Sequence, residues 1–118
     1  MTRKQFIDMI ATAESDNKPK TIGDGGMAGG LFQMHFAWRV DYWPAWAWNV
    51  LALLDESALQ NFVTYDRDGK LRPSMTARQL ADLFNTGHPA ADPKYDERCL
   101  AALHYLDIDS EQFDSIVE

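Results

Sequence analysis

The sequence predicts an all-α fold, or a mainly α fold with a minor hairpin, formed by one domain over residues 1–118. Apolar residues recur at the three- and four-residue spacing of helices in several segments, and no segment alternates apolar and polar residues as a half-buried strand does. A length of 118 residues supports one hydrophobic core but not two. No repeat, linker or low-complexity segment divides the chain.

Helices are expected at three places in the first half of the chain. Thr2 can cap a helix over roughly residues 3–14, whose apolar face includes Phe6, Ile7, Met9 and Ile10. A second helix is expected to start near Gly30 and to carry Leu31, Phe32 and Met34. A third opens at Pro44. Because residues 44–56 are apolar almost all round, it is expected to be the buried central helix.

The second half is expected to alternate shorter helices with turns. Ser57 can cap a short continuation of the preceding helix, and residues 65–74 indicate a turn region. Thr76 and Gln79 form a capping box for a helix over residues 77–86. Gly87 and Pro89 are expected to end that helix. Asp92 and Pro93 are expected to start a helix over 94–106, and Ser110 can cap a last short helix.

The composition is that of a globular protein, with 46% hydrophobic and 25% charged residues. The net charge of −7 argues against nucleic-acid binding, because contacts with phosphates need a basic surface. A single cysteine, Cys99, excludes an internal disulfide. No apolar run has the length of a membrane span, so membrane insertion is not expected. Residues 1–16 are interrupted by Asp8 and do not form a signal peptide, which predicts a protein that stays in the cytoplasm until it is released.

Glu14 stands where the first predicted helix ends. It follows Ile10 by four residues and Ile7 by seven, so the three side chains share the apolar face of that helix. Burial and the negative end of the helix dipole both disfavour the ionised carboxylate, which predicts a raised pKa. A carboxylic acid still protonated near neutral pH can act as the general acid of glycosidic bond cleavage. The alternative is a glutamate at a helix end that turns into solvent.

A glycine-rich loop follows Glu14 directly. Residues 13–35 contain five glycines, and glycine loses more backbone entropy on folding than any other residue. Such a loop lets the backbone approach a ligand closely, and Gln33 offers both a hydrogen-bond donor and an acceptor. The composition is typical of a sugar-binding loop and equally of a plain glycine-rich turn. A phosphate-binding P-loop is excluded, because no Gly-Lys-Ser/Thr sequence follows.

Two motifs, in this order, resemble those of the lytic transglycosylase and goose-type lysozyme superfamily. The first is AES at 13–15, followed by IGDGG at 22–26 and GGLFQMH at 29–35. It is similar to the family's Glu-Ser, glycine-rich loop and Gly-Leu-(Met/Phe)-Gln. The second, LADLFNTG at 80–87, is similar to Ala-Tyr-Asn-x-Gly, with Phe84 where the family has Tyr. Together they make the resemblance cover roughly residues 5–90.

The resemblance implies a compact lysozyme-like domain that cleaves the β-1,4 bond between N-acetylmuramic acid and N-acetylglucosamine in peptidoglycan glycan strands. Glu14 would be the general acid and, in a transglycosylase, then the base, with Ser15 helping to orient it. The residues implied to line the saccharide cleft are Gly30, Leu31 and Gln33, together with Phe84 and Asn85 from the second motif. Because Phe84 lacks a hydroxyl, any hydrogen bond that the family's Tyr makes is lost. No metal or cofactor is expected, and the protein is expected to be a monomer.

Three outcomes stay open for this site. A lytic transglycosylase, the preferred interpretation, uses the sugar's own C6 hydroxyl and needs no second carboxylate. A hydrolytic lysozyme needs a base to activate water, for which Asp24 is the first candidate and Asp41 the second. The alternative role for Asp24 is structural, because an aspartate at this position can make an Asx-turn in the loop. The third outcome is a non-catalytic glycan-binding module. Without a signal peptide, a bacteriolytic enzyme of this kind, such as a phage endolysin, would reach the wall through a membrane pore, a virion or cell lysis.

All four tryptophans fall within residues 38–48. Trp46 and Trp48 are expected in the core, whereas Trp38 and Trp43 could equally fill the core or stack against sugars. The other candidate metal ligands show no zinc-ligand spacing: His35, His88, His104 and Cys99.

Overall fold

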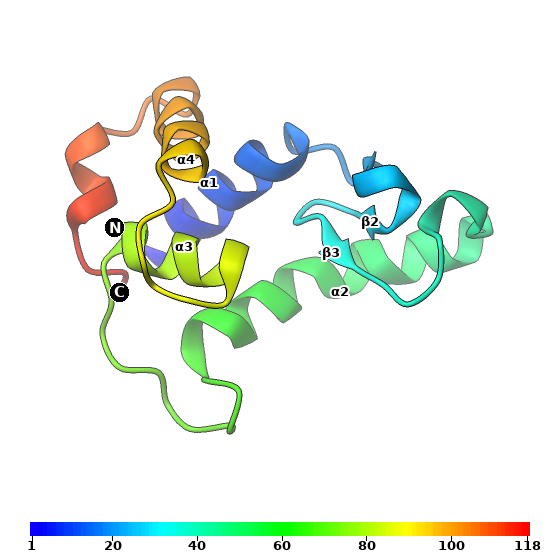
Figure 1. The fold of residues 1–118 in the computed structure, drawn as a ribbon, viewed down its shortest axis with the longest axis horizontal. Coiled ribbons are helices and arrows are strands. Elements are labelled where there is room, and N and C mark those ends of the chain that lie inside the picture. The colour runs from blue at the N-terminus through cyan, green and yellow to red at the C-terminus, as the bar shows by residue number, and fades with distance from the viewer.

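The fold is mainly α with a small antiparallel sheet (Figure 1), so the prediction that includes a minor hairpin agrees with it. The structure, a computed structural model, describes all residues 1–118. The α-helices are α1 (Arg3–Ser15), α2 (Ala45–Thr64), α3 (Ala77–Thr86) and α4 (Pro93–Tyr105). The strands are β1 (Ile22–Gly23), β2 (Ala28–Gly29) and β3 (Met34–His35), and the 3₁₀-helices are η1 (Asp24–Gly26), η2 (Val40–Tyr42) and η3 (Ser110–Asp114).

The starts of α1 and α3 follow local capping chemistry, as predicted. Thr2 and Gln5 form a reciprocal capping box at α1, and Thr76 and Gln79 form another at α3. Gly87 closes α3 in the left-handed conformation at φ 83°. Two predicted details are wrong. Ser57 caps nothing, because α2 runs without a break, and η3 is capped by Asp109 rather than Ser110.

The helix predicted to start near Gly30 does not form. This segment instead turns back on itself between β2 and β3, with Ala28 opposite His35 and Gly29 opposite Met34. Gly30 lies at φ 89° and Gln33 at φ 50°, and neither value fits a right-handed helix. β1 pairs with the other edge of β2, so the sheet order is β1-β2-β3.

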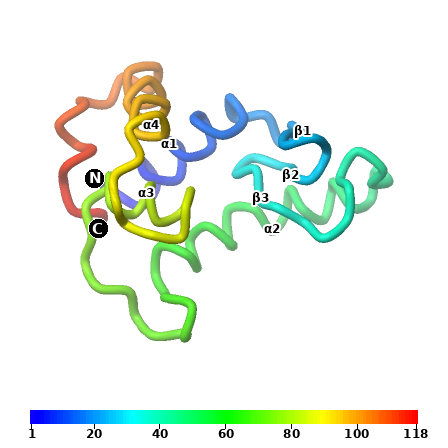
Figure 2. The backbone as a smooth tube through the Cα atoms, in the orientation of Figure 1, coloured from blue at the N-terminus to red at the C-terminus, as the bar shows by residue number.

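The prediction that the helix after Pro44 is buried is also wrong. Along α2 only Leu51, Asp55, Leu59 and Val63 are buried. Trp46 is 69% exposed and Leu53 is 81% exposed. Figures 1 and 2 show α2 along one side of the molecule, with the sheet near its first half and the helices α1 and α3 near its second half. No helix, α2 included, is both long and apolar enough to cross a membrane.

The hydrophobic core lies among α1, α3, α4, η3 and the second half of α2. It contains 17 buried residues, of which the largest fully buried ones are Phe6, Met9, Ile10, Phe32, Leu59, Leu80, Leu103 and Phe113. The chain ends meet beside this core (Figure 2), where the Met1 ammonium donates to Ser115 Oγ at 2.8 Å and the Glu118 amide donates to the Met1 carbonyl at 2.9 Å. α1 is thus packed into the core up to Ala11, and Glu14 follows in its last turn.

Candidate active site

A cavity of about 520 Å³ opens where the end of α1 meets the sheet, α3 and α4. Two sets of residues line it. We call the set from the helices the helical wall: Glu14, Phe84, Asn85 and Arg98. We call the set from η1 and the β2–β3 segment the hairpin wall: Asp24, Ala28, Phe32, Gln33, Met34 and His35.

Glu14 is half-buried in the last turn of α1. Burial raises the pKa of its carboxyl above the ordinary value of 4.5, because the charged form loses water. The nearby Tyr95 hydroxyl and the charge of Arg98 oppose this rise in pKa, and His35 opposes it further. Glu14 therefore holds its proton more tightly than a solvated glutamate does. Once the proton is lost, Tyr95, Arg98 and His35 stabilise the carboxylate.

Tyr95 supplies a hydroxyl next to Glu14. It lies in the first turn of α4 and is 2% exposed. Its hydroxyl is buried near the Glu14 carboxyl but makes no hydrogen bond. Burial, and then the charge of Glu14, raise the pKa of Tyr95 above its ordinary value. The phenol therefore stays protonated, as a donor near Glu14.

Arg98 covers the end of α1. Its guanidinium donates a short hydrogen bond to the Ala13 carbonyl and lies 5.6 Å from the centre of the Tyr95 ring. The last turn of α1 has no basic residue of its own, so Arg98 provides the cation that complements the negative end of the helix dipole.

Asp24 lies on the opposite wall in a different environment. Its Oδ2 is 3.0 Å from His35 Nε2, and the two side chains are 64% and 66% exposed. Asp24 has a φ of 51° but its carboxylate accepts no backbone hydrogen bond, so the Asx-turn considered above does not form. The cavity thus contains one half-buried carboxyl and one solvated, imidazole-paired carboxylate.

Gln33 holds the turn that carries the hairpin wall. Its Nε2 donates to the carbonyls of Thr21 at 2.9 Å and Gly30 at 3.0 Å. Its Oε1 lies against Gly23, where an added Cβ would be only 2.1 Å away. Both amide hydrogens are therefore used internally, and any polar contact with a ligand falls to Oε1.

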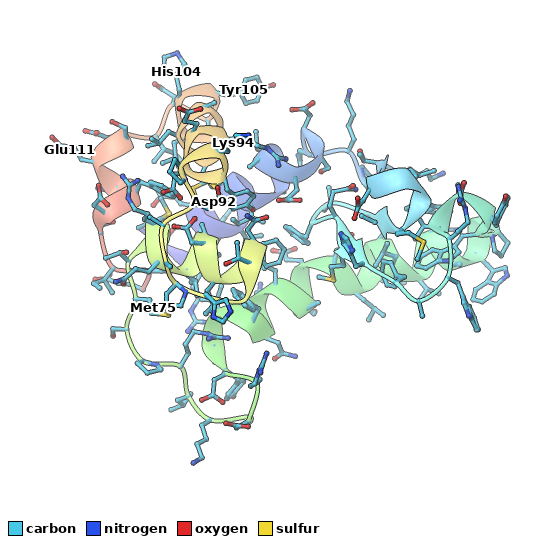
Figure 3. The ribbon with its side chains drawn as sticks, in the orientation of Figure 1. Met75, Asp92, Lys94, His104, Tyr105 and Glu111 are labelled. Atoms are coloured by element: carbon cyan, nitrogen blue, oxygen red, sulfur yellow. The ribbon has the colours of Figure 1, made fainter.

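Phe84 and Asn85 both line the cavity from the last turn of α3. The Phe84 ring meets Phe62 of α2 edge-on at 5.5 Å between centroids. Asn85 Nδ2 donates to Asp92 Oδ2 at 3.1 Å, which ties α3 to the N-cap of α4. Figure 3 shows Asp92 at the start of α4, with His104 and Tyr105 at the far end of that helix.

Three residues lie elsewhere than expected: Ser15, expected to orient Glu14, and Gly30 and Leu31, expected to line the cleft. The Ser15 hydroxyl donates to the Ala11 carbonyl at 2.9 Å and accepts from the Lys18 amide, so it holds the end of α1 rather than Glu14. Gly30 faces α2, not the cavity, and Leu31 packs against the core. The backbone at 30–31 is turned toward α2 because the Leu31 amide donates to the Asp55 carboxylate at 3.2 Å.

Sequence reasoning missed three residues of this site: His35, Tyr95 and Arg98. For Tyr95 and Arg98 the sequence contained one signal: they are three residues apart and thus share a face of α4. His35 had none, because only the pairing of β2 with β3 brings it beside Asp24.

The site contains no group of three or more His, Cys, Asp or Glu side chains that could hold a metal ion, and neither does the rest of the chain. No protein-family model, curated protein or solved structure matches this sequence.

Proposed function

We propose that the protein is a peptidoglycan-degrading enzyme with a lysozyme-like fold. In this proposal it cleaves the β-1,4 bond between N-acetylmuramic acid and N-acetylglucosamine by lytic transglycosylation. The observation that supports it most directly is Glu14: a half-buried carboxyl with a raised pKa, lining a cavity that also contains residues of both sequence motifs. A group of this kind can deliver a proton to a glycosidic oxygen near neutral pH.

The chemistry needs Glu14 in both protonation states. The protonated carboxyl donates to the glycosidic oxygen as the C1–O bond breaks and positive charge develops on the muramic acid ring. The resulting carboxylate then takes the proton of the C6 hydroxyl as that oxygen bonds to C1, giving a 1,6-anhydro end and restoring the acid. Burial favours the first state, while Tyr95 and Arg98 stabilise the second.

The other cavity residues fit recognition of N-acetyl sugars. Oε1 of Gln33 is the free acceptor for an acetamido N–H, because both amide hydrogens are already engaged. Asn85 offers its own carbonyl oxygen, since its amide group is held by Asp92. The Phe84 ring gives an apolar surface for a sugar face or methyl group.

The deciding experiment is digestion of purified peptidoglycan, followed by mass spectrometry of the soluble muropeptides. Wild-type protein should release 1,6-anhydro products. Glu14→Gln should lower the rate by at least about 100-fold, because the amide cannot donate the proton, while circular dichroism and melting temperature stay near wild type. A folded Glu14→Gln variant with wild-type turnover would refute the role of Glu14. Binding of glycan strands by the wild type with no products would indicate a non-catalytic module.

One observation favours a second candidate, a hydrolytic lysozyme. Asp24 lies on the wall opposite Glu14 and is paired with His35, so a carboxylate is available to activate a water across the cavity. The same spectra separate the two reactions, because hydrolysis adds water and leaves reducing muramic acid ends in place of anhydro ends.

A further inference from the structure

A second and larger cavity, of about 1180 Å³, lies on the other side of the last turn of α3. Its walls are the second half of α2, the loop over residues 65–72 and the end of α3 at residues 83–88. Nothing in the chemistry proposed for Glu14 uses it. We call it the arginine cavity, because Arg67 and Arg72 line it together with His88.

The loop that forms one wall is closed by its own hydrogen bonds. Tyr65 and Leu71 form an antiparallel bridge, and the Asp66 amide donates to the Lys70 carbonyl at 2.8 Å. Oδ1 of Asp66 accepts from the amides of Asp68 at 2.9 Å and Lys70 at 3.0 Å. Asp66 is the acidic residue in the lining, and its Oδ1 is thus engaged by the loop's own backbone.

The cations of the cavity are not neutralised by ion pairs. Arg72 donates from Nε to the Phe62 carbonyl at 2.8 Å and from Nη2 to the Tyr65 carbonyl at 2.9 Å, and its guanidinium lies 4.6 Å from the centre of the Phe62 ring. Arg67 takes part in no ion pair or side-chain hydrogen bond, although the chain carries a net charge of −7. The cavity therefore offers one fixed and one free guanidinium, beside the apolar side chains of Phe62 and Leu83.

The arginine cavity and the Glu14 cavity share a wall. Phe62 lines the first and Phe84 lines the second, and their rings are in edge-on contact at 5.5 Å. Along α3, Leu83 and Thr86 face the arginine cavity, whereas Asn85 faces the Glu14 cavity. The two cavities are therefore neighbours, with the Phe62 and Phe84 rings between them.

We propose that the arginine cavity binds the carboxylates of the peptide stem that branches from N-acetylmuramic acid. This inference rests on the proposed function, because it assigns the second site to the same substrate. Stem peptides combine alanine methyl groups with free carboxylates, which match apolar side chains beside guanidinium groups. A stem of four residues extends about 13 Å. This exceeds the 5.5 Å between the centroids of the Phe62 and Phe84 rings, which separate the two cavities.

Cleavage kinetics give the first test, with Arg67→Gln as the variant and Lys70→Gln as its matched control. Lys70 is on the same loop but does not line the cavity. On peptide-bearing glycan strands, Arg67→Gln should lower kcat/KM by about tenfold, the loss expected for one charge-assisted contact. On strands stripped of peptides by an amidase, neither variant should differ from wild type. Equal losses on both substrates, or no loss on either, would overturn the inference.

Equilibrium binding gives a test that does not depend on cleavage. Folded Glu14→Gln protein is titrated with a free tetrapeptide stem, and amide chemical shifts are followed by NMR. Shift changes should concentrate at residues 61–72 and 83–88. The affinity obtained from them should fall with added salt, and it should fall at least about tenfold for a peptide with amidated carboxylates. If no substrate is cleaved but these shifts appear, the proposed function fails and the cavity assignment stands. If cleavage occurs and the peptide causes no such shifts, or if a glycerol phosphate oligomer binds there instead, the cavity assignment fails.

Discussion

The two walls of the Glu14 cavity present carboxyl groups in opposite environments. Glu14 belongs to a 13-residue helix that packs into the core, and its half-burial raises its pKa. Asp24 belongs to a three-residue 3₁₀ turn, and its side chain is 64% exposed beside His35. The same functional group is therefore half-buried on one wall and solvated beside an imidazole on the other, and the supporting structure makes the difference.

The walls also differ in what lies behind them. The helical wall is backed by the main core. The hairpin wall reaches that core through Phe32, and it also lies against the first half of α2 through two glycines. A Cβ on Gly29 would be 3.1 Å from the Trp48 ring, and a Cβ on Gly30 would be 2.8 Å from Leu51 Cδ2. The hairpin wall is thus held by close backbone contacts that tolerate few side chains, and the predictions below probe this difference.

Gly30→Val should have the largest effect on stability. Gly30 lies at φ 89°, where a β-branched residue is strained, and its Cβ would also collide with Leu51 and lie 3.0 Å from Asp55 Oδ2. We expect a loss of about 2–4 kcal/mol in the free energy of unfolding, with activity falling in parallel. Urea denaturation and muropeptide release measure the two effects.

Gly25→Ala is the matched control, because Gly25 also has a positive φ, 65°, but has nothing within 4 Å of an added Cβ. It should cost only about 1 kcal/mol. A Gly30→Val protein that keeps its stability and loses only activity would show that Gly30 faces the ligand, as the sequence alone suggested.

Gly30 shows where sequence reasoning stops. Helix starts such as the Thr76–Gln79 box depend on residues three positions apart, so they could be predicted from local chemistry. The reversal at Gly30 depends on the pairing of β2 with β1 and β3, and on the hydrogen bond from the Leu31 amide to Asp55, which lies 24 residues after Leu31. The uniformly apolar segment 44–56 likewise contains no pattern that says which of its faces is covered.

The same limit applies to the candidate site. Glu14, Asp24, Gln33, Phe84 and Asn85 were expected from motifs and periodicity, and all five line the cavity. Tyr95 and Arg98 come from a helix whose position against α1 is set by core packing, which no local pattern encodes.

The helical wall should be sensitive to pH through Asp82 of α3. Both of its carboxyl oxygens are buried without hydrogen bonds. Burial, and then the neighbouring Asp96, raise the pKa of Asp82 from 3.8 to about 7. Between those two pH values the native state keeps a proton that the unfolded chain releases. Stability should therefore fall as pH rises through this window, by at most about 1.4 kcal/mol per pH unit, and level off above it.

Asp82→Asn should flatten this pH dependence and leave the protein at least as stable as wild type at pH 7. Chemical denaturation at a series of pH values measures it. The background should be Glu14→Gln, because the raised pKa of Glu14 gives a slope of the same sign. An unchanged slope in the double variant would show that Asp82 is already ionised in the folded protein.

Asp24→Asn should have a mild effect if the sugar's own hydroxyl is the nucleophile. The contact of Asp24 with His35 is exposed, so its loss should change stability by less than about 1 kcal/mol. Activity should stay near wild type, with anhydro products. A loss of about 10²–10⁴-fold together with reducing ends in the wild-type digest would instead make Asp24 the base of a hydrolase. A His35→Gln variant, which removes the partner but keeps Asp24, controls for loss of the pair alone.

The smallest effect is expected at Trp46. The sequence predicts that Trp46 and Trp48 both lie in the core, but Trp46 is 69% exposed. Because both tryptophans lie on α2, the same substitution at each position compares its exposed and its packed face. Trp48 packs on Gly29 behind the hairpin wall and lies 5.5 Å from the Trp43 ring. Trp48→Ala should therefore cost about 1–3 kcal/mol and loosen the hairpin wall, whereas Trp46→Ala should stay within about 0.5 kcal/mol of wild type in urea denaturation. Equal losses for the two variants would mean that the exposed face of α2 is covered in solution, and the loss at Trp46 would then depend on protein concentration if a second copy covers it.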